Sequence, residues 1–468
     1  MLHKHVIVNG LKEMIMKTKL LLLYLFIGFY SLSGIAQTTE EITTSGTFTV
    51  PGGVSEITIE AWGGGGAGGT VGSSNVAAGG GGSGAYSQST ISVTPGEELD
   101  ITVGNGGTPE TGSGAVDGKK SKVTRAGSST DLIVAEGGKS VTGVNNTSKA
   151  AGGLATNGFA KGTPSVKKDG NKGDDGTSSK PGNSGKGGDA PNVFDSNGNL
   201  VSTGGASVST DSDGNKGNVP GGGGSGAAFD SDFFPNSGGN GAKGRVDITY
   251  TRIIQTKNGD FDVASNWNNG VLPSSPDNFA AIDEGVTSTI TQNENINYLT
   301  LENNSKIKLG SNKLNVKGNL ENKSQFTGSG EVIFNGTSNQ ELSGNGNYSN
   351  LRLNNDGEID INGNITVTGD FINSSQLVRL NSSNLNVDGN ITNNSEFNLN
   401  GNKLNVKGNI TNNSPFTGAG EVILNGPTAT TQELSGDGAY DDLTLENGVN
   451  VNSESVLNIN GDINSGNN

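Results

Sequence analysis

Apolar residues alternate with polar residues along several short stretches in the first half of the chain. Residues 54–62 place Ile57, Ile59 and Ala61 on one side, and residues 245–250 repeat this pattern. A period of two residues predicts β-strands with one buried face. The same pattern predicts further strands at residues 48–50, 89–93, 99–103 and 131–135, and the Pro95-Gly96 turn predicts a hairpin that joins 89–93 to 99–103. Five or six such strands predict a sandwich or jelly roll.

In the second half of the chain, alternation recurs with a fixed period. The octapeptide NKLNVKGN at residues 312–319 returns unchanged at residues 402–409, and the flanking similarity indicates a duplication of about 90 residues. Within it, a shorter core of the form LNVxGN begins at Leu314, Leu385 and Leu404. These spacings give a rung of roughly 18–20 residues, and therefore predict a right-handed parallel β-helix or related β-solenoid over residues 299–468.

Alternation within each rung predicts which side chains point inward. The predicted inward stacks are formed by Leu314, Val316, Leu385, Val387, Leu404 and Val406. Asparagine occupies the position between these residues, as in Asn315, Asn386, Asn405 and Asn458. These asparagines predict either a ladder of side-chain amides or a solvated polar face. The pattern alone does not distinguish the two arrangements.

Glycine occupies 78 positions, most of them between residues 51 and 250. Such tracts are either disordered linkers or extended threefold helices that pack closely because they lack side chains. The flanking strands, which can share a core, favour packed helices. Gly64, Gly66 and Gly69 match a dinucleotide-binding pattern, but no helical periodicity follows them, so we reject a nucleotide site.

Several of these segments resemble a known family. FTVPGGV at 48–54, GGGGSGA at 79–85 and 221–227, ITVGNGG at 101–107 and GGNGAKGRV at 238–246 resemble the glycine-rich domain of bacterial surface and phage tail-fibre proteins. They are also similar to the glycine-rich, jelly-roll-associated domain of anaplastic lymphoma kinase-type receptors. The resemblance covers residues 38–252 and implies a recognition or structural module.

A second resemblance lies between the two halves. Residues 267–273 (WNNGVLP) and 276–282 (PDNFAAI) resemble the module that precedes β-helical repeats in exported Bacteroidota proteins. It implies that residues 253–298 cap the solenoid and that Trp267 closes the open end, the alternative being an exposed aromatic that stacks on a ligand. Trp62, at the end of a predicted strand, is expected to be structural.

The N-terminus has the pattern of a secretory leader. A basic start at Met16-Lys17-Thr18-Lys19 precedes the apolar run 20–30 and the small residues Gly34-Ile35-Ala36. This predicts a signal peptide over residues 1–36, translated from Met16 and cleaved after Ala36. The apolar run is too short to span a bilayer, which needs about 20 residues, so we expect no transmembrane segment and a secreted, extracellular or outer-surface location.

Composition narrows the chemistry. The net charge is −16, and removing the leader, which carries four lysines and one glutamate, makes it about −19. This charge argues against nucleic acid as a partner. The chain has no cysteine, and both histidines and all three methionines lie within residues 1–36. The chain after residue 36 therefore cannot form a Ser-His-Asp triad, a cysteine nucleophile or a histidine-ligated metal site.

Carboxylates are the remaining candidates for chemistry. The nearest candidates are Asp356, Glu358 and Asp360 with Arg352, and Asp370 and Asp388 with Arg379. Asp356 and Glu358 alternate with apolar residues, which fits a solvated strand face better than a catalytic pair, and we predict no catalytic residues. Asp211, Asp213 and Asn215 resemble the opening of a calcium-binding loop that lacks its later ligands, which predicts at most weak calcium binding and no other cofactor.

These features predict a secreted or cell-surface, adhesin-like or structural protein without catalytic activity. Its glycine-rich module would recognise an extracellular ligand such as a glycan, or other envelope proteins, from a solenoid stalk. The alternative is a polysaccharide-active lyase or hydrolase, because parallel β-helices often host such enzymes. A passive envelope protein would differ in having no saturable ligand.

Overall fold

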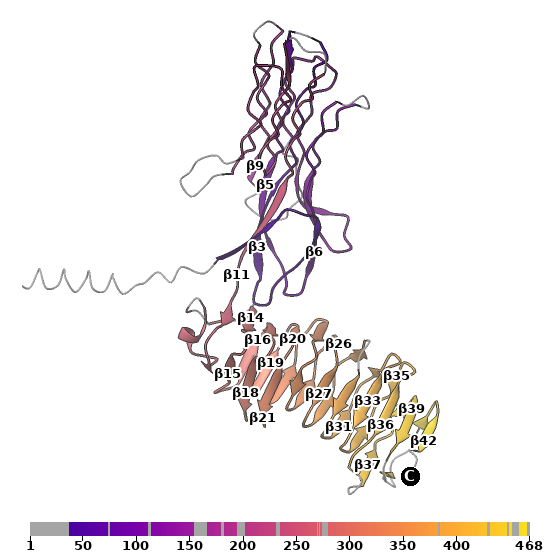
Figure 1. Ribbon diagram of the computed structural model, residues 1–468. Helices are drawn as coiled ribbons and strands as arrows, with labels where there is room; N and C mark the ends of the chain where they lie inside the picture. Colours follow the sequence, from indigo (N-terminus) through magenta and orange to yellow (C-terminus); the bar gives the residue numbers. More distant parts are fainter. Residues whose placement is uncertain are drawn as a thin grey trace, which may run out of the picture.

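The computed structural model describes residues 37–468 except 74, 111–113, 154–165, 179–181, 194–201, 231–234, 269, 271, 274–278, 382–383, 428–430, 447–448, 452–457 and 466–468. The predicted signal peptide, Met16 and the cleavage site at Ala36 lie outside the described residues. The predicted all-β class is confirmed, since one short 3-10 helix, η1 (Ala264–Asn266), is the sole helical element in the described part. A glycine-rich β domain stands on the end of a long solenoid, and the two run in different directions (Figure 1).

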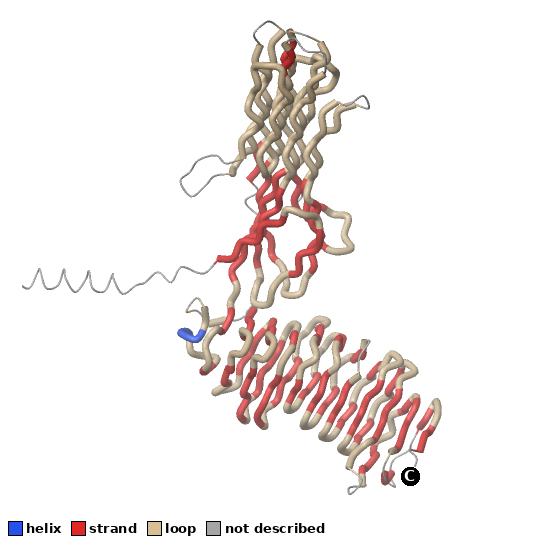
Figure 2. The backbone as a smooth tube through the Cα atoms, in the orientation of Figure 1, coloured by secondary structure: helices blue, strands red, loops and turns tan. Residues whose placement is uncertain are grey.

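Two antiparallel sheets form the base of the glycine-rich domain (Figure 2). The first contains, in spatial order, β1 (Gln37–Ile42), β11 (Arg245–Thr251), β3 (Glu56–Trp62), β5 (Tyr86–Ser92) and β9 (Val166–Lys168). The second contains β2 (Gly46–Thr49), β6 (Glu98–Thr102), β7 (Ser121–Arg125) and β8 (Asp131–Ala135). Their inner faces share one apolar core, which includes the Ile57, Ile59 and Ala61 side predicted from alternation.

The predicted hairpin between residues 89–93 and 99–103 is wrong. Strand β5 pairs with β3 and β9, whereas β6 pairs with β2 and β7 in the other sheet. Residues 93–97 therefore cross from one sheet to the other. Both strands point their apolar sides, including Ile91 and Leu99, into the same core, Ile91 from the first sheet and Leu99 from the second.

Above the sandwich, the glycine tracts form a bundle of extended segments (Figure 2). In the segment that follows β3, Gly63, Gly66 and Gly69 donate backbone hydrogen bonds to Ala85, Gly82 and Gly79, at 2.8–3.0 Å. The residues between them donate to other segments, such as Gly64 to Lys119 and Gly65 to Ala242. An N–H that returns to the same neighbour every third residue defines a threefold helix, so the packed-helix interpretation is confirmed over the linker interpretation.

The two GGGGSGA segments lie side by side in this bundle, because Gly81 donates to Gly224 and Gly84 donates to Gly221. A Cβ atom added at Gly223 would lie 2.2 Å from the carbonyl oxygen of Gly81, and one at Gly82 would lie 1.9 Å from that of Ala151. Only a residue without a side chain allows such an approach. At the far end of the bundle, β4 (Val76–Ala77) pairs with β10 (Ala228–Phe229).

The second half is a parallel β-solenoid, as predicted. It has about nine turns, with three strands per turn. Its first face contains β12 (Ile254–Gln255), β14 (Phe279–Ile282), β17 (Tyr298–Leu301), β20 (Leu320–Asn322), β23 (Gln340–Ser343), β26 (Glu358–Asn362), β29 (Leu377–Leu380), β32 (Phe397–Asn398) and β35 (Phe416–Thr417).

The second face contains β13 (Gly259–Asp260), β15 (Thr287–Thr289), β18 (Lys306–Gly310), β21 (Gln325–Gly328), β24 (Asn347–Tyr348), β27 (Ile365–Val367), β30 (Leu385–Val387), β33 (Lys403–Val406), β36 (Glu421–Leu424), β39 (Asp442–Leu445) and β42 (Ile463–Ser465). The third face contains β16 (Glu294–Ile296), β19 (Lys313–Val316), β22 (Glu331–Phe334), β25 (Leu351–Leu353), β28 (Phe371–Asn373), β31 (Ile391–Asn393), β34 (Ile410–Asn412), β37 (Gln432–Ser435) and β40 (Val449–Val451). A short pair, β38 (Ala439–Tyr440) and β41 (Asn458–Ile459), completes the last turns.

The repeated octapeptides do not share a face. The copy at 312–319 supplies β19 on the third face, whereas the copy at 402–409 supplies β33 on the second face. From β19 to β33 the chain advances fourteen strands, which is four turns and two strands. The four asparagines therefore do not form one row: Asn405 donates to Asn386 at 2.9 Å, as a ladder requires, but Asn315 lies on the third face and Asn458 lies in β41.

A different amide ladder lies inside the solenoid. Asn373 donates to Asn393, and Asn393 donates to Asn412, each at 2.9 Å, and all three residues are fully buried. Their amide groups also donate to backbone carbonyls of the following turn, such as that of Ser414. Buried amides are stable only when their hydrogen bonds are satisfied, and this ladder satisfies them turn by turn.

Candidate functional site

The predicted structural residues lie in the cores. Leu314, Val316, Leu385, Val387, Leu404 and Val406 are all at most 1% exposed. Trp267 is buried, donates from Nε1 to the carbonyl of Phe261 at 2.8 Å and packs edge-on against its ring in the first turns of the solenoid. Trp62 is also buried and donates to the carbonyl of Pro191 at 2.9 Å.

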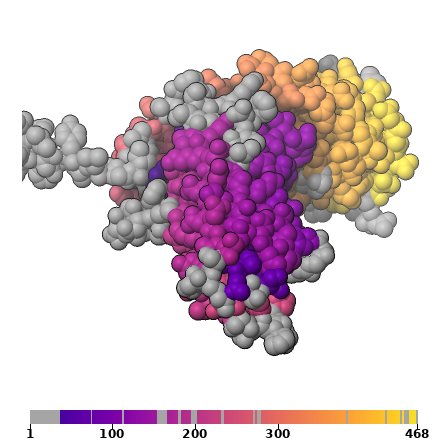
Figure 3. Space-filling model, turned by 90° about the horizontal axis from the view of Figure 1, so that it is seen from above, coloured from indigo at the N-terminus to yellow at the C-terminus, as the bar shows by residue number. Residues whose placement is uncertain are grey.

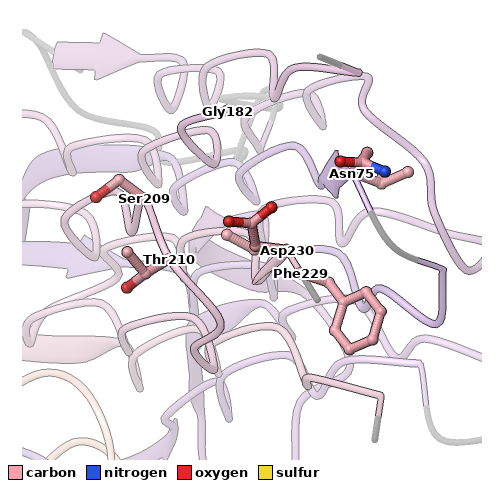
Figure 4. A pocket seen from close by; sticks show the side chains of 8 residues that line it. Asn75, Gly182, Ser209, Thr210, Phe229 and Asp230 are labelled. Atoms are coloured by element: carbon pink, nitrogen blue, oxygen red, sulfur yellow. The ribbon is translucent and has the colours of Figure 1, made fainter. Parts of the chain in front are cut away.

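The far end of the glycine bundle is closed by a small apolar cluster around Phe229 and Val71. Beside it lies a recess between Phe229, Asp230, Asn75 and the Ser209-Thr210 segment (Figure 4). Its volume is about 10 Å³, which is room for about one water molecule. The tip therefore presents loops and not a ligand-sized cavity in this recess.

The predicted calcium ligands are engaged by different parts of the backbone. Asp211 accepts from the N–H of Asp230, Asp213 accepts from that of Ser237 at 2.7 Å, and the Asn215 amide donates to the carbonyl of Ala206 at 2.9 Å. These contacts tie the loop to its neighbours in the bundle. Over the described ranges, no group of three or more His, Cys, Asp or Glu residues is placed to hold a metal ion.

The carboxylates considered for catalysis are spread along the solenoid. Glu358 on β26 pairs with Arg379 one turn away at 2.5 Å, and this hydrogen bond lowers the pKa of the Glu358 carboxyl. Asp388 pairs with Lys407 at 2.7 Å, and Asp370 accepts from the backbone N–H of Asn390 at 2.9 Å. A general acid needs a raised pKa, so a carboxylate with a lowered one is better suited to a surface ion pair.

One carboxylate in the glycine-rich domain is strongly perturbed. Asp247 on β11 lies between Glu41 and Glu60 on the adjacent strands, is 5% exposed, and contacts Arg245 at 2.8 Å. Burial, more than the two neighbouring carboxylates, raises the pKa of Asp247 to about 6. The Arg245 guanidinium also lies 4.9 Å over the Trp62 ring.

The junction between the two parts is held by Arg252. Its guanidinium donates to the carbonyl of Gly52 at 2.8 Å and to Glu302 of the solenoid at 2.7 Å. Thr300, which points outward from β17, is only 2% exposed because the turn at Gly52 covers it. Figure 3, seen from the bundle end, shows the glycine-rich domain standing in front of one end of the solenoid.

Two recesses flank this contact, with volumes of about 420 and 490 Å³, and they share Thr94 and Glu97. Both lie between the loops of the sandwich and the first solenoid face, and we call them together the junction groove. Its lining is Thr49, Ser55, Glu56, Ser92–Glu97, Arg125, Phe279, Tyr298–Thr300, Asn319, Glu321, Glu341 and Ser343. Binding sites of 300–1,000 Å³ at domain junctions are common, so this groove is the best candidate site in the described part.

Sequence reasoning missed both the junction groove and Asp247. A signal for the groove was available, because the inward positions of Leu299 and Leu301 place Tyr298 on the outer face of its strand. Nothing in the pattern indicated that loops of the other domain would stand over it.

The fold and the candidate site together define the class of protein. A glycine-rich β domain joined to a β-solenoid is the organisation of a structural or surface protein. More particularly, residues 41–251 match the model of the glycine-rich domain family, a span that coincides with the sandwich and its bundle. No curated protein matches the chain. In the residues that the structure describes, no helix has the length and apolarity to cross a membrane.

Proposed function

We propose that the chain is a secreted or cell-surface protein that binds an extracellular ligand without transforming it. In this proposal the solenoid is a stalk, and the glycine-rich domain is the recognition module. Surface glycans and other envelope proteins are the partners that fit the location we expect.

The observation that carries the proposal is the closed packing of the glycine bundle. Its segments satisfy one another's backbone groups in three directions, as at Gly64, Gly65 and Gly66, and they approach too closely to leave space inside. Such a bundle can act only through its ends and its outer surface. Rigid scaffolds that carry loops at their ends are typical of recognition domains.

Electrostatics support binding over catalysis. The carboxylates nearest to a catalytic arrangement are used in ion pairs or backbone contacts along the solenoid, as for Glu358, Asp370 and Asp388. After residue 36 the chain has no histidine or cysteine to act as base or nucleophile.

A combined binding and turnover screen of the purified chain against polysaccharides tests the proposal, together with fractionation of the producing cells. Saturable binding without product supports it. Turnover that is abolished by Asp370→Asn or Asp388→Asn would replace it with the polysaccharide-active alternative. No saturable ligand at all would favour a passive structural role.

A further inference from the structure

Two aromatic side chains of the solenoid differ from all the others in the described residues. Nine of the eleven aromatic residues after residue 253 are at most 4% exposed: Phe261, Trp267, Phe326, Phe334, Tyr348, Phe371, Phe397, Phe416 and Tyr440. Phe279 and Tyr298 are only half-buried. Both lie in the junction groove. Partly exposed aromatics that are confined to one groove indicate a binding surface.

The two rings form a stacked pair. Phe279 on β14 and Tyr298 on β17 are register partners on the first face, with ring centroids 4.6 Å apart and planes 3° apart. Each ring therefore has one face against its partner. Phe279 lines one recess of the groove and Tyr298 lines the other, so the stacked pair supplies aromatic surface to both recesses.

The polar walls of the groove carry four carboxylates, Glu56, Glu97, Glu321 and Glu341, and the last three are held by side-chain partners. Glu97 pairs with Arg125, Glu321 pairs with Lys323 at 2.9 Å, and Glu341 accepts from the Asn362 amide at 2.9 Å. The remaining lone pairs of these oxygens can accept hydrogen bonds from hydroxyl groups. An anionic ligand would be repelled, and at Glu97 and Glu321 a cationic one would have to compete with Arg125 and Lys323.

We propose that the junction groove binds a neutral oligosaccharide, with one sugar ring against Phe279 in one recess and another against Tyr298 in the other. A sugar ring has an apolar C–H face, which matches the electron-rich face of an aromatic ring, and a rim of hydroxyls, which matches the carboxylate and amide walls. The inference rests on the proposed recognition function, names its ligand class, and adds the first turns of the solenoid to the glycine-rich domain as a wall of the site.

The test uses the full chain and titration calorimetry with defined neutral hexasaccharides, one each of β-1,4-glucan, β-1,3-glucan, β-1,4-mannan and β-1,4-xylan. At least one should bind the wild type. Tyr298→Ala and Phe279→Ala should each weaken that binding by about tenfold or more, whereas Tyr298→Phe, which keeps the ring, should stay within about twofold. Val144→Ala, at a residue 51% exposed beside the bundle tip, tests the tip as the alternative site, and Tyr298→Phe is the matched control for the groove.

Thermal unfolding of each variant separates loss of binding from loss of fold, and Tyr298→Phe keeps the test informative if an alanine variant unfolds. Binding that survives Tyr298→Ala and Phe279→Ala but is lost in Val144→Ala would place the site at the bundle tip. This result would overturn the assignment of the site to the junction groove and leave the proposed function intact. Absence of binding to all four hexasaccharides, or binding of a lysine-rich peptide in their place, would overturn the ligand class.

Discussion

Replacing Gly223 by alanine tests whether the glycine tracts are a close-packed bundle. The added Cβ would lie 2.2 Å from the carbonyl oxygen of Gly81, where ordinary contact begins at 3.4 Å, so one segment must move by roughly 1 Å. That segment is hydrogen-bonded on several sides, as when Gly81 donates to Gly224 at 2.9 Å. Overpacking costs about 1–3 kcal/mol and each disrupted hydrogen bond about 1 kcal/mol, so we expect a loss of about 3–5 kcal/mol.

Urea unfolding followed by tryptophan fluorescence measures this loss domain by domain. Trp62 lies in the glycine-rich domain and Trp267 in the solenoid, so a Trp267→Phe background reports on the glycine-rich domain through Trp62. Gly46→Ala is the matched control, because a Cβ at Gly46 meets nothing within 4 Å, and it should stabilise by about 0.5 kcal/mol. If Gly223→Ala loses less than about 1 kcal/mol relative to this control, the packing argument is refuted.

Three further changes have defined outcomes. Folding raises the pKa of Asp247 to about 6, so the stability that its protonated carboxyl contributes is complete below about pH 4 and is lost as the pH rises through 6. Asp247→Asn should therefore stabilise the protein by about 1–3 kcal/mol at pH 7 and leave its stability unchanged below pH 4, as measured by urea unfolding across pH. Asn393→Ala leaves the amides of Asn373 and Asn412 incompletely paired and should lower the stability of the solenoid by about 2–4 kcal/mol in the same assay. The control Asn394→Ala, at an exposed residue, should lower it by less than about 0.5 kcal/mol. Equal losses of stability would contradict the role of the ladder. Arg252→Ala removes the bridge to Glu302 and should broaden the distribution of domain orientations in small-angle scattering while leaving each domain's unfolding midpoint in place; an unchanged profile would show that other contacts hold the junction.

The alternation of apolar and polar residues predicted which side of each strand is buried, but not which strands pair with one another. It placed Ile91 and Leu99 correctly on buried faces, yet it paired their strands in one sheet when they lie in two. A period of two residues states only that one face is apolar, and an antiparallel hairpin and a crossing between sheets both satisfy that condition. The choice depends on β2, whose pairing with β6 comes from residues about fifty positions away.

The junction groove lay further beyond sequence reasoning for the same reason. Its walls come from the loop at Thr94–Glu97 and from Tyr298, about 200 residues apart, and no local pattern encodes that they meet. The burial of Asp247 could not be predicted for the same reason, because it depends on three strands whose order in the sheet differs from their order in the chain.

The duplicated segment shows how local sequence and global position separate in a solenoid. Gln340 donates to the carbonyls of Val316 and Gly318, and its counterpart Gln432 donates to those of Val406 and Gly408, so both copies keep the same local contacts. Yet Gln340 lies on the first face and Gln432 on the third, because the copies are offset by a number of strands that is not a multiple of three. All three faces must therefore offer nearly the same environment to a rung. This equivalence allows a stalk to grow by duplication without regard to face, whereas a groove that needs Phe279, Tyr298 and Glu97 together can exist at only one level of the solenoid.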